Sequence, residues 1–363
     1  MIPICKPLID EAEIKNVVEV LRSGMLACGE WVKRFEEEFA KFIGVKYAVA
    51  TTSGTVALDI ALKAIGIKSG DEVIVPDFTF IATANAVLFQ NAKPVFADVD
   101  EKTFTIDPDD VLEKITPKTK AIIGVHLFGH PFDVKAIKEI CEDHNLFLIE
   151  DCAQAHGAEY KGRKVGSFGD VSCFSFYATK NMTTGEGGMV LTNNREIERK
   201  LRLLINHGQE QKYLHTTLGY NYRMTNIQAA IGIAQLRKLE IFNERRIKNA
   251  EYLNKHLKVP LETPYKKKDV KHVYHQYVVK IKEDFPMSRD EFINYLSEKG
   301  IGSAVHYPLP IHKQPLYQKL GYPENLCPVA TELSKVVLSL PVHPALTEKE
   351  LRFICEVINS VVI

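Results

Sequence analysis

Lys180 stands in a context that is unusual for a charged side chain. It follows an apolar, aromatic segment that ends at Tyr177, and it precedes a turn with glycines at positions 185, 187 and 188. We predict a buried amine, because apolar strands flank this turn on both sides. Burial lowers the pKa of an amine, and a neutral amine is the nucleophile that Schiff-base chemistry requires. The glycines would let the backbone pass close to a bound group.

Asp151 is a second candidate, because it directly follows the apolar segment LFLIE at 146–150. Ligands of open α/β sheets lie beyond the carboxyl ends of the strands. A carboxylate at such a place can cap a helix, or bind a metal, a ribose hydroxyl or a protonated ring nitrogen. The nearby His126, His130 and His156 lack the spacing of a catalytic zinc site, so we predict no metal site.

Two further segments extend this set. Thr52-Ser53-Gly54-Thr55 leads from a short strand into a helix, where free backbone N–H groups and the positive helix end form a cradle for an anion. Taken alone, an ordinary helix cap is the commoner explanation of this segment. Phe80 follows the strand EVIVP at 72–76, and it either stacks on a bound ring or packs in the core.

Together these residues are the parts of a site for pyridoxal phosphate (PLP). A lysine supplies the covalent attachment, and a carboxylate pairs with the protonated ring nitrogen. A helix start binds the phosphate, and an aromatic side chain covers the ring. Each feature is weak alone, but all four occur in one chain, so we predict PLP as the cofactor.

Strands and helices alternate through the first part of the chain, as is typical of a mostly parallel sheet with helices on both faces. The apolar patterns predict helices at 10–22, 30–43, 56–65, 79–90 and 133–144, and strands at 72–76, 94–97, 121–126, 146–150, 171–176 and 189–192, with a further short strand starting at residue 47.

The pattern changes after residue 225. Residues 226–256 predict one long or broken helix, and residues 273–281 alternate like a half-buried strand. Ser288 to Glu291 is a capping box that opens a helix, which Gly300 closes. We predict an α/β fold with a large PLP-binding domain at 1–238, whose mostly parallel sheet is covered by helices, and a smaller C-terminal α+β domain at 239–363.

Composition excludes several classes of function. Lys and Arg together number 46, as do Asp and Glu, so there is no basic excess for nucleic acid. The seven cysteines are scattered without a C-x-x-C pair, which fits thiols in a reducing cytoplasm. No apolar run approaches the roughly 20 residues of a membrane span, and the amino terminus lacks a signal peptide. We expect a soluble cytoplasmic protein that binds neither nucleic acid nor membrane.

Five motifs in order resemble the DegT/DnrJ/EryC1/StrS family of PLP-dependent sugar aminotransferases. The resemblance runs from about residue 2 to about residue 345, and it implies the type I aminotransferase fold and a homodimer with shared active sites. The motifs are TSGT (52–55), DFTFIATANA (77–86), EDCAQAHGA (150–158), SFYATKNMTTGEGG (175–188) and GYNYRMTNIQAA (219–230).

The resemblance also implies a role for each matching residue. One branch of the family carries histidine at the lysine position and removes oxygen from sugars, so Lys180 favours transamination. The implied roles are covalent attachment of PLP for Lys180, the ring nitrogen for Asp151, the two ring faces for Phe80 and Ala153, the phenolic oxygen for Gln154, the phosphate for Gly54, Thr55 and Ser175, and the phosphate of the other subunit's cofactor for Asn221.

The implied reaction moves an amino group from an amino acid, by resemblance glutamate, to a nucleotide-linked 4-keto or 3-keto hexose. Such a reaction belongs to the biosynthesis of amino sugars and surface polysaccharides. We predict that Arg223 binds the donor's carboxylate or a substrate phosphate across a twofold interface, because a guanidinium suits a bidentate anion contact.

Two alternatives stay open. One is a type I aminotransferase for free amino and keto acids, which commonly binds the α-carboxylate with an arginine of the small domain. After Arg246 the chain has only Arg289 and Arg352, and neither is an obvious ligand. The other alternative is a PLP-binding regulatory protein, although no DNA-reading element is evident.

Overall fold

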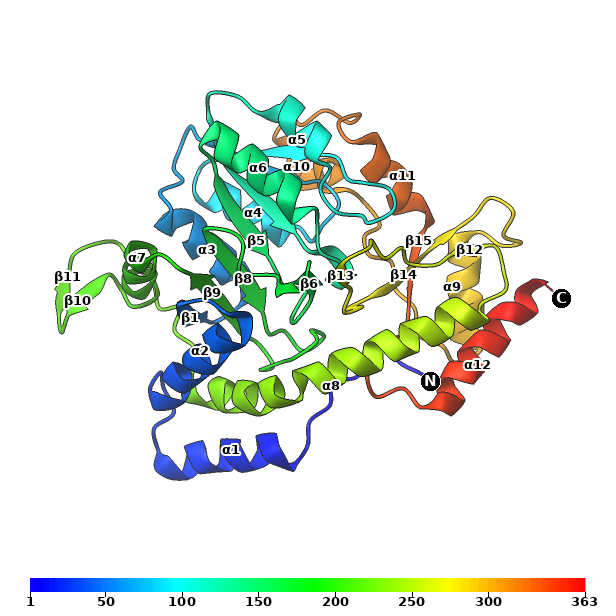
Figure 1. Cartoon of the computed structure of the whole chain (residues 1–363), viewed down its shortest axis with the longest axis horizontal. Helices are drawn as coiled ribbons and strands as arrows, with labels where there is room; N and C mark the ends of the chain where they lie inside the picture. The colour runs from blue at the N-terminus through cyan, green and yellow to red at the C-terminus, as the bar shows by residue number, and fades with distance from the viewer. Residues whose placement is uncertain (363) are drawn as a thin grey trace.

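A seven-stranded sheet forms the centre of the structure, which is a computed structural model describing residues 1–362 (Figure 1). β9 runs antiparallel to both neighbours, and the other adjacent strands are parallel. The mostly parallel sheet is therefore confirmed, and each strand predicted for this sheet matches an observed one to within two residues at either end. The spatial order is β1 (Tyr47–Thr51), β9 (Gly188–Thr192), β8 (Val171–Ser175), β5 (Phe147–Asp151), β4 (Thr119–Val125), β2 (Glu72–Pro76) and β3 (Lys93–Ala97).

Helices cover both faces of this sheet, as predicted. Successive strand residues point to opposite faces. Val73 and Val75 accordingly join a core with α3, α4 and α7, whereas Ile74 joins a core with α5 and α6. Near β1 and β9 this second face is covered by α2 and α8. These helices are α2 (Glu30–Ile43), α3 (Gly54–Ala64), α4 (Ala82–Phe89), α5 (Pro108–Lys114), α6 (Val134–His144), α7 (Arg195–Ile205) and α8 (Asn226–His256).

α8 is one unbroken helix of 31 residues, and Thr225 and Gln228 form a capping box at its start. It packs against α1 (Glu11–Ser23) and α2 at one end and extends to the carboxyl-terminal elements at the other (Figure 1). The helix runs through position 238 without a break, and residues 311–337 contribute side chains to the core beside β2. The boundary between residues 238 and 239 stays a prediction.

The carboxyl-terminal part holds a three-stranded antiparallel sheet, β12 (Leu261–Glu262), β14 (Tyr277–Ile281) and β15 (Val337–Leu340). The strand predicted at 273–281 begins four residues later, because Tyr274 has a left-handed φ of 45° that breaks the extended conformation. Four helices accompany this sheet, α9 (Arg289–Glu298), α10 (Pro315–Lys319), α11 (Pro328–Val336) and α12 (Glu348–Asn359). The predicted capping box of Ser288 and Glu291 is confirmed.

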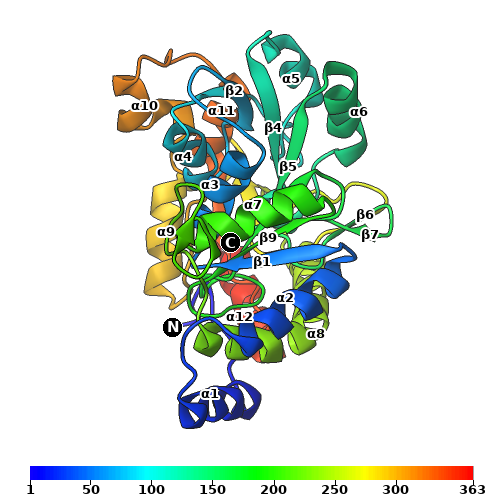
Figure 2. The same cartoon turned by 90° about the vertical axis from the view of Figure 1, so that its left-hand side faces the viewer.

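Short elements complete the fold. A two-stranded hairpin projects from the body beside α7, at the left of Figure 1, and Figure 2 turns this side of the molecule, with α7, toward the viewer. Within residues 1–362, no helix is long and apolar enough to cross a membrane. The short elements are β6 (Glu159–Tyr160), β7 (Arg163–Lys164) and β13 (Val270–Lys271) in one sheet, β10 (Gln209–Gln211) and β11 (Leu214–His215) in the hairpin, and the 3-10 turns η1 (Leu127–Gly129), η2 (Ile311–Lys313) and η3 (Ser360–Val362).

A buried ion pair fastens η2 to the end of β2. His312 Nδ1 lies 2.5 Å from the Asp77 carboxylate, and His312 Nε2 lies 2.9 Å from the carbonyl oxygen of Glu324. Both partners accept hydrogen bonds, so both ring nitrogens carry protons and the ring is cationic. Burial opposes this charge, but the hydrogen bond and the charge of Asp77, together with the hydrogen bond to Glu324, outweigh burial and raise the pKa of His312 above its usual value. The pair therefore binds the segment before α10 to the main sheet.

We expect His312→Phe to lower the free energy of unfolding by about 3–5 kcal/mol at neutral pH, because Asp77 would stay buried without its partner. The folded-state pKa of His312 is raised, so the contribution is fully present below about pH 6.5 and is lost as the pH rises through the raised pKa. Urea unfolding at several pH values checks this. A difference between the two proteins that does not shrink at alkaline pH would contradict it.

Candidate active site

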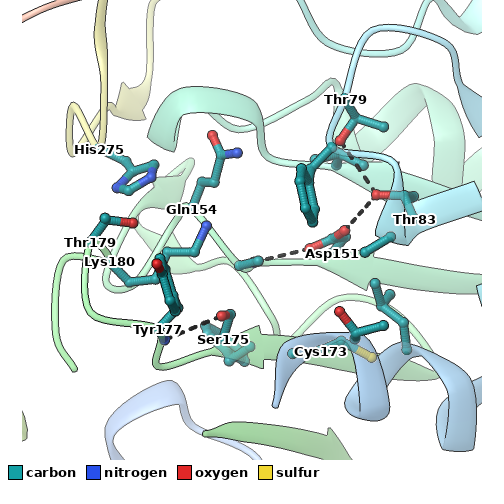
Figure 3. A pocket seen from close by; sticks show the side chains of 18 of the residues that line it. Thr79, Thr83, Asp151, Gln154, Cys173, Ser175, Tyr177, Thr179, Lys180 and His275 are labelled. Atoms are coloured by element: carbon teal, nitrogen blue, oxygen red, sulfur yellow. Dashed lines mark hydrogen bonds between the residues drawn. The ribbon is translucent and has the colours of Figure 1, made fainter. Parts of the chain in front are cut away.

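Lys180 and Asp151 line one cavity of about 480 Å³ at the carboxyl ends of the parallel strands (Figure 3). The cavity collects residues from β5, β8, the start of α3 and the loop before α4, and residues 275–276 and 306–307 close it from the carboxyl-terminal part. Of the predicted site residues, the cavity is lined by Gly54, Thr55, Phe80, Asp151, Ala153, Gln154, Ser175 and Lys180. Their proposed roles stay predictions.

Asp151 is the last residue of β5, and its carboxylate is buried. Oδ2 accepts a hydrogen bond from Thr83 Oγ1 at 3.0 Å, and Oδ1 accepts one from the backbone N–H of Ala153 at 3.1 Å. Burial raises the pKa of Asp151, although both hydrogen bonds and the charge of Lys180 oppose this shift. No helix begins at Asp151, so the carboxylate is not a helix cap. It is poised to pair with a cationic group in the cavity.

Lys180 lies on the opposite side of the cavity from Asp151, next to Thr179 and His275 (Figure 3). Its backbone N–H donates to the carbonyl of Tyr177, which closes the turn after β8. Burial lowers the pKa of the amine to about 8, and the negative charge of Asp151 opposes this shift. A substantial fraction of the amine is therefore neutral near physiological pH, as a nucleophile requires.

The predicted anion cradle lies at the start of α3, and its role toward a phosphate stays a prediction. Ser53 caps the helix by accepting a hydrogen bond at Oγ from the backbone N–H of Val56, so the ordinary explanation holds for this residue. Gly54 and Thr55 follow it at the cavity wall. A Cβ atom at position 54 would lie only 2.6 Å from the Cβ of Ser175, so glycine alone allows the helix start to meet β8 this closely.

Phe80 is 56% exposed and lines the cavity, so it does not pack in the core. An exposed apolar ring at a cavity wall favours the stacking role. Gln154 is buried nearby, where its Oε1 accepts from the backbone N–H of Phe128 and its Nε2 donates to the hydroxyl of Tyr307 at 3.0 Å. The amide of Gln154 is thus held in one orientation.

Asn221 and Arg223 are not among the residues that line the cavity. The Arg223 guanidinium donates to the side-chain oxygens of Asn221 and Asn206 at 2.8–3.2 Å. Arg223 also forms an isolated β-bridge with Thr51, at the end of β1. Within one chain the structure places the pair outside the cavity, and their predicted roles toward a neighbouring subunit are not tested.

Sequence reasoning missed several cavity residues. Thr83 lies within a recognised motif but is singled out only by its contact with Asp151. His275, His306 and Tyr307 come from distant segments that no local pattern connects to Lys180. Burial, reinforced by the charge of Lys180, lowers the pKa of His306 to about 4, so this ring is neutral at physiological pH.

Two buried clusters have the composition of metal sites, Asp77 with His312 and Cys327, and His126 with Glu150 and Cys152. Both ring nitrogens of each histidine already have hydrogen-bond partners. Glu150 accepts from His126 and from three backbone N–H groups of the turn 166–169. These contacts explain both clusters as structural hydrogen-bond networks.

The cavity fits PLP. Its donor set combines a partly buried amine of lowered pKa, a buried carboxylate, a helix start without acidic side chains in its first turn, and an exposed phenylalanine ring. Bound there, Lys180 would hold the aldehyde carbon, Asp151 the ring nitrogen, and Gly54, Thr55 and Ser175 the phosphate.

Residues 7–359 match the model of the DegT/DnrJ/EryC1/StrS aminotransferase family. The chain belongs to this family. A GDP-perosamine synthase of Escherichia coli O157:H7 is 41% identical over 99% of this chain and 98% of its own length. A UDP-N-acetyl-3-dehydro-α-D-glucosamine 3-aminotransferase of Acidithiobacillus ferrooxidans is 43% identical over 97% and 94%. The PLP form of Spr1654 from Streptococcus pneumoniae superposes with a TM-score of 0.94 at 30% identity, covering 99% of this chain and 98% of that chain.

These similarities confirm the predicted family, and with it the type I aminotransferase fold and the assignment of this aminotransferase as an enzyme. Members of the family that differ in nucleotide and in sugar, such as the GDP- and UDP-linked relatives above, align over nearly the whole chain. The overall fold therefore does not encode the choice of nucleotide or of sugar.

We expect Lys180 of the apoprotein to titrate near pH 8, well below the ordinary lysine value of about 10.4. Competitive acetylation at graded pH, read by peptide mass spectrometry, measures this value. A Lys180 profile that coincides with that of surface lysines would contradict the burial argument.

Replacing Asp151 by asparagine, its neutral isostere, should shift the pKa of Lys180 in a defined direction, and the same acetylation assay measures this shift. The charge of Asp151 raises the pKa of Lys180, so Asp151→Asn should lower the apparent pKa of Lys180 further. Glu186→Gln is the control, because Glu186 also lines the cavity but is not among the groups that shift Lys180. If the apparent pKa of Lys180 is the same in Asp151→Asn as in the wild type, the charges of the two groups do not interact.

Proposed function

We propose that this aminotransferase uses PLP to move an amino group from an amino acid, glutamate by family resemblance, to a keto hexose linked to a nucleotide. The product belongs to amino-sugar and surface-polysaccharide biosynthesis. The observation that carries this proposal is that one cavity holds both a partly buried amine of pKa about 8 and a buried carboxylate. The relatives named for GDP-linked and UDP-linked sugars support the substrate class.

PLP, when bound, stores the amino group between the two halves of the reaction and takes up the electrons of the carbon that loses its proton. Lys180 holds the cofactor between turnovers. Its neutral amine, once free, would move the proton from the donor's α-carbon to the cofactor, and in the second half of the reaction it would move a proton from the cofactor to the sugar carbon. Asp151 keeps the ring nitrogen protonated, and Phe80 shields one ring face from water.

The alternative, an aminotransferase that acts only on free amino and keto acids, has less support. Arg289 donates to the carbonyl of Ser334, and Arg352 pairs with Glu348 on the surface. Neither lines the cavity, and no arginine is among its lining residues within the described part of the chain. Among the described residues, the cavity wall of a single chain thus carries no guanidinium that could bind a carboxylate or a phosphate.

A second subunit would supply that cation. We propose a homodimer in which Arg223 and Asn221 reach the neighbour's cavity, Asn221 at the cofactor phosphate and Arg223 at the donor's carboxylate or a substrate phosphate. The hairpin of β10 and β11 and the residues after it carry Tyr213, Leu214 and Leu218, which are 82%, 49% and 72% exposed. Large apolar side chains gathered just before Asn221 favour coverage by a partner.

The substrate class is tested with the purified holoenzyme, glutamate and a panel of 3-keto and 4-keto sugars linked to UDP, GDP or dTDP. We expect an amino-sugar product, detected by its mass, from at least one member of the panel, together with 2-oxoglutarate. Free 2-keto acids serve as the comparison. Turnover of keto acids alone would favour the first alternative, and bound PLP without turnover of any donor would favour a regulatory protein.

The shared site is tested with a mixed dimer of inactive Lys180→Ala and inactive Arg223→Ala chains. One of the two sites in a heterodimer then holds both native residues, so we expect about half of the normal activity per heterodimer. Heterodimers are verified by two different affinity tags. Mixing that restores nothing in verified heterodimers would show that each site belongs to one chain.

A further inference from the structure

The loop after Lys180 is fastened along its length to one helix. Three side chains of α8 bind it, at distances of 2.8, 3.4 and 2.8 Å, and the loop runs antiparallel to the helix because its later residues meet earlier turns. The three contacts join Asn243 Oδ1 to Asn181 Nδ2, Gln235 Oε1 to the N–H of Thr183, and Gln228 Nε2 to the carbonyl of Glu186. α8 therefore holds the loop that follows the catalytic lysine in place through three hydrogen bonds.

Asn243 also binds the turn that follows Asp151. Its Nδ2 donates to the carbonyl oxygen of His156 at 2.7 Å. The next residue, Gly157, has a left-handed φ of 76°, and a Cβ atom there would lie 2.9 Å from Asn243 Nδ2. The turn is thus shaped to admit this amide, which is itself buried.

Hydrogen bonds hold the side chain of Asn181, the residue after Lys180, in one orientation. Its Nδ2 donates to Asn243 and to the carbonyl of Val273, which uses both of its hydrogens. Its Oδ1 lies 3.2 Å from His275 Nδ1, so that histidine nitrogen must be the donor. The ring of His275 is neutral, since burial and the nearby charge of Lys180 lower its pKa well below the usual value. Its Nε2 is then a fixed acceptor at the cavity.

We propose that Asn243 is a positioning residue for transamination, whose carboxamide sets the separation of Lys180 and Asp151. Among the residues that the structure describes, it is the one α8 side chain that hydrogen-bonds both to the loop after Lys180 and to the turn after Asp151. The inference rests on the proposed function, in which Lys180 must meet the carbon beside a ring that Asp151 holds. Misplacement of a catalytic group by about 1 Å costs up to about a hundredfold in rate.

Asn249 provides a matched control. It is another buried asparagine of α8, six residues further on, and its Nδ2 donates to the carbonyls of Val342 and His343. These residues do not line the cavity. Asn243→Ala and Asn249→Ala therefore remove similar buried amides from the same helix, but only the first touches the catalytic turns.

The experiment compares both variants with the wild type in three measurements, namely the melting temperature, the pH profile of Lys180 acetylation in the apoprotein, and kcat and KM of the holoenzyme. We expect both variants to have a lower melting temperature than the wild type. Only Asn243→Ala should shift the Lys180 profile toward the ordinary lysine value, and it should lower kcat by about tenfold to a hundredfold with a smaller change in KM. Equal Lys180 profiles and equal kcat in the two variants would overturn the proposal.

Asn243→Leu covers the case in which the alanine variant does not fold. Leucine fills the space of the buried amide and adds no charge, but it makes neither hydrogen bond, so we expect a folded protein with an altered Lys180 profile. A wild-type profile in this variant would equally overturn the proposal. A wild type that binds no PLP at Lys180 refutes the proposed function instead, and the acetylation profiles of the apoproteins still decide the role of Asn243.

Discussion

The burial of one amine and one carboxylate in the same cavity is the constraint around which the structure is organised. Burial moves the pKa of Lys180 down and that of Asp151 up, while the charge of each opposes the shift of the other. An isolated buried charge is costly. The two groups persist because hydrogen bonds from Thr83 and Ala153 stabilise the carboxylate, and because a bound cofactor would satisfy both groups.

The fold serves this constraint by bringing rigid elements to the two groups. Parallel strands place their carboxyl ends at one edge, so β5 delivers Asp151 and β8 leads into the turn of Lys180. α8 fastens the Lys180 loop from behind through its buried amides. The ion pair of Asp77 and His312 fastens η2, which follows the segment with His306 and Tyr307, to the end of β2. The catalytic side chains thus lie at strand ends and in turns, and the surrounding helices and strands fix their positions.

Much of this arrangement is predictable from the sequence, because apolar periodicity and motif order are local properties. The strands around the site and the residues of the cradle follow from short patterns such as LFLIE before Asp151. The contacts of Asn243 and His275 are not predictable in this way, since they join segments 62 and 94 residues from Asn181. The late start of β14 is not predictable either, because the residue pattern alternates through Tyr274, whereas the left-handed backbone of Tyr274 is not extended. Roles that need a partner subunit, such as those of Asn221 and Arg223, lie beyond one chain.

The most direct test of the account is to locate the cofactor before and after the donor is added. The holoenzyme is reduced with borohydride, digested and analysed by mass spectrometry, once alone and once after incubation with glutamate. The account predicts a phosphopyridoxyl group on the Lys180 peptide in the first sample and its loss in the second, because the donor displaces the lysine. A label on another lysine, or a label on Lys180 that no amino donor removes, would contradict it.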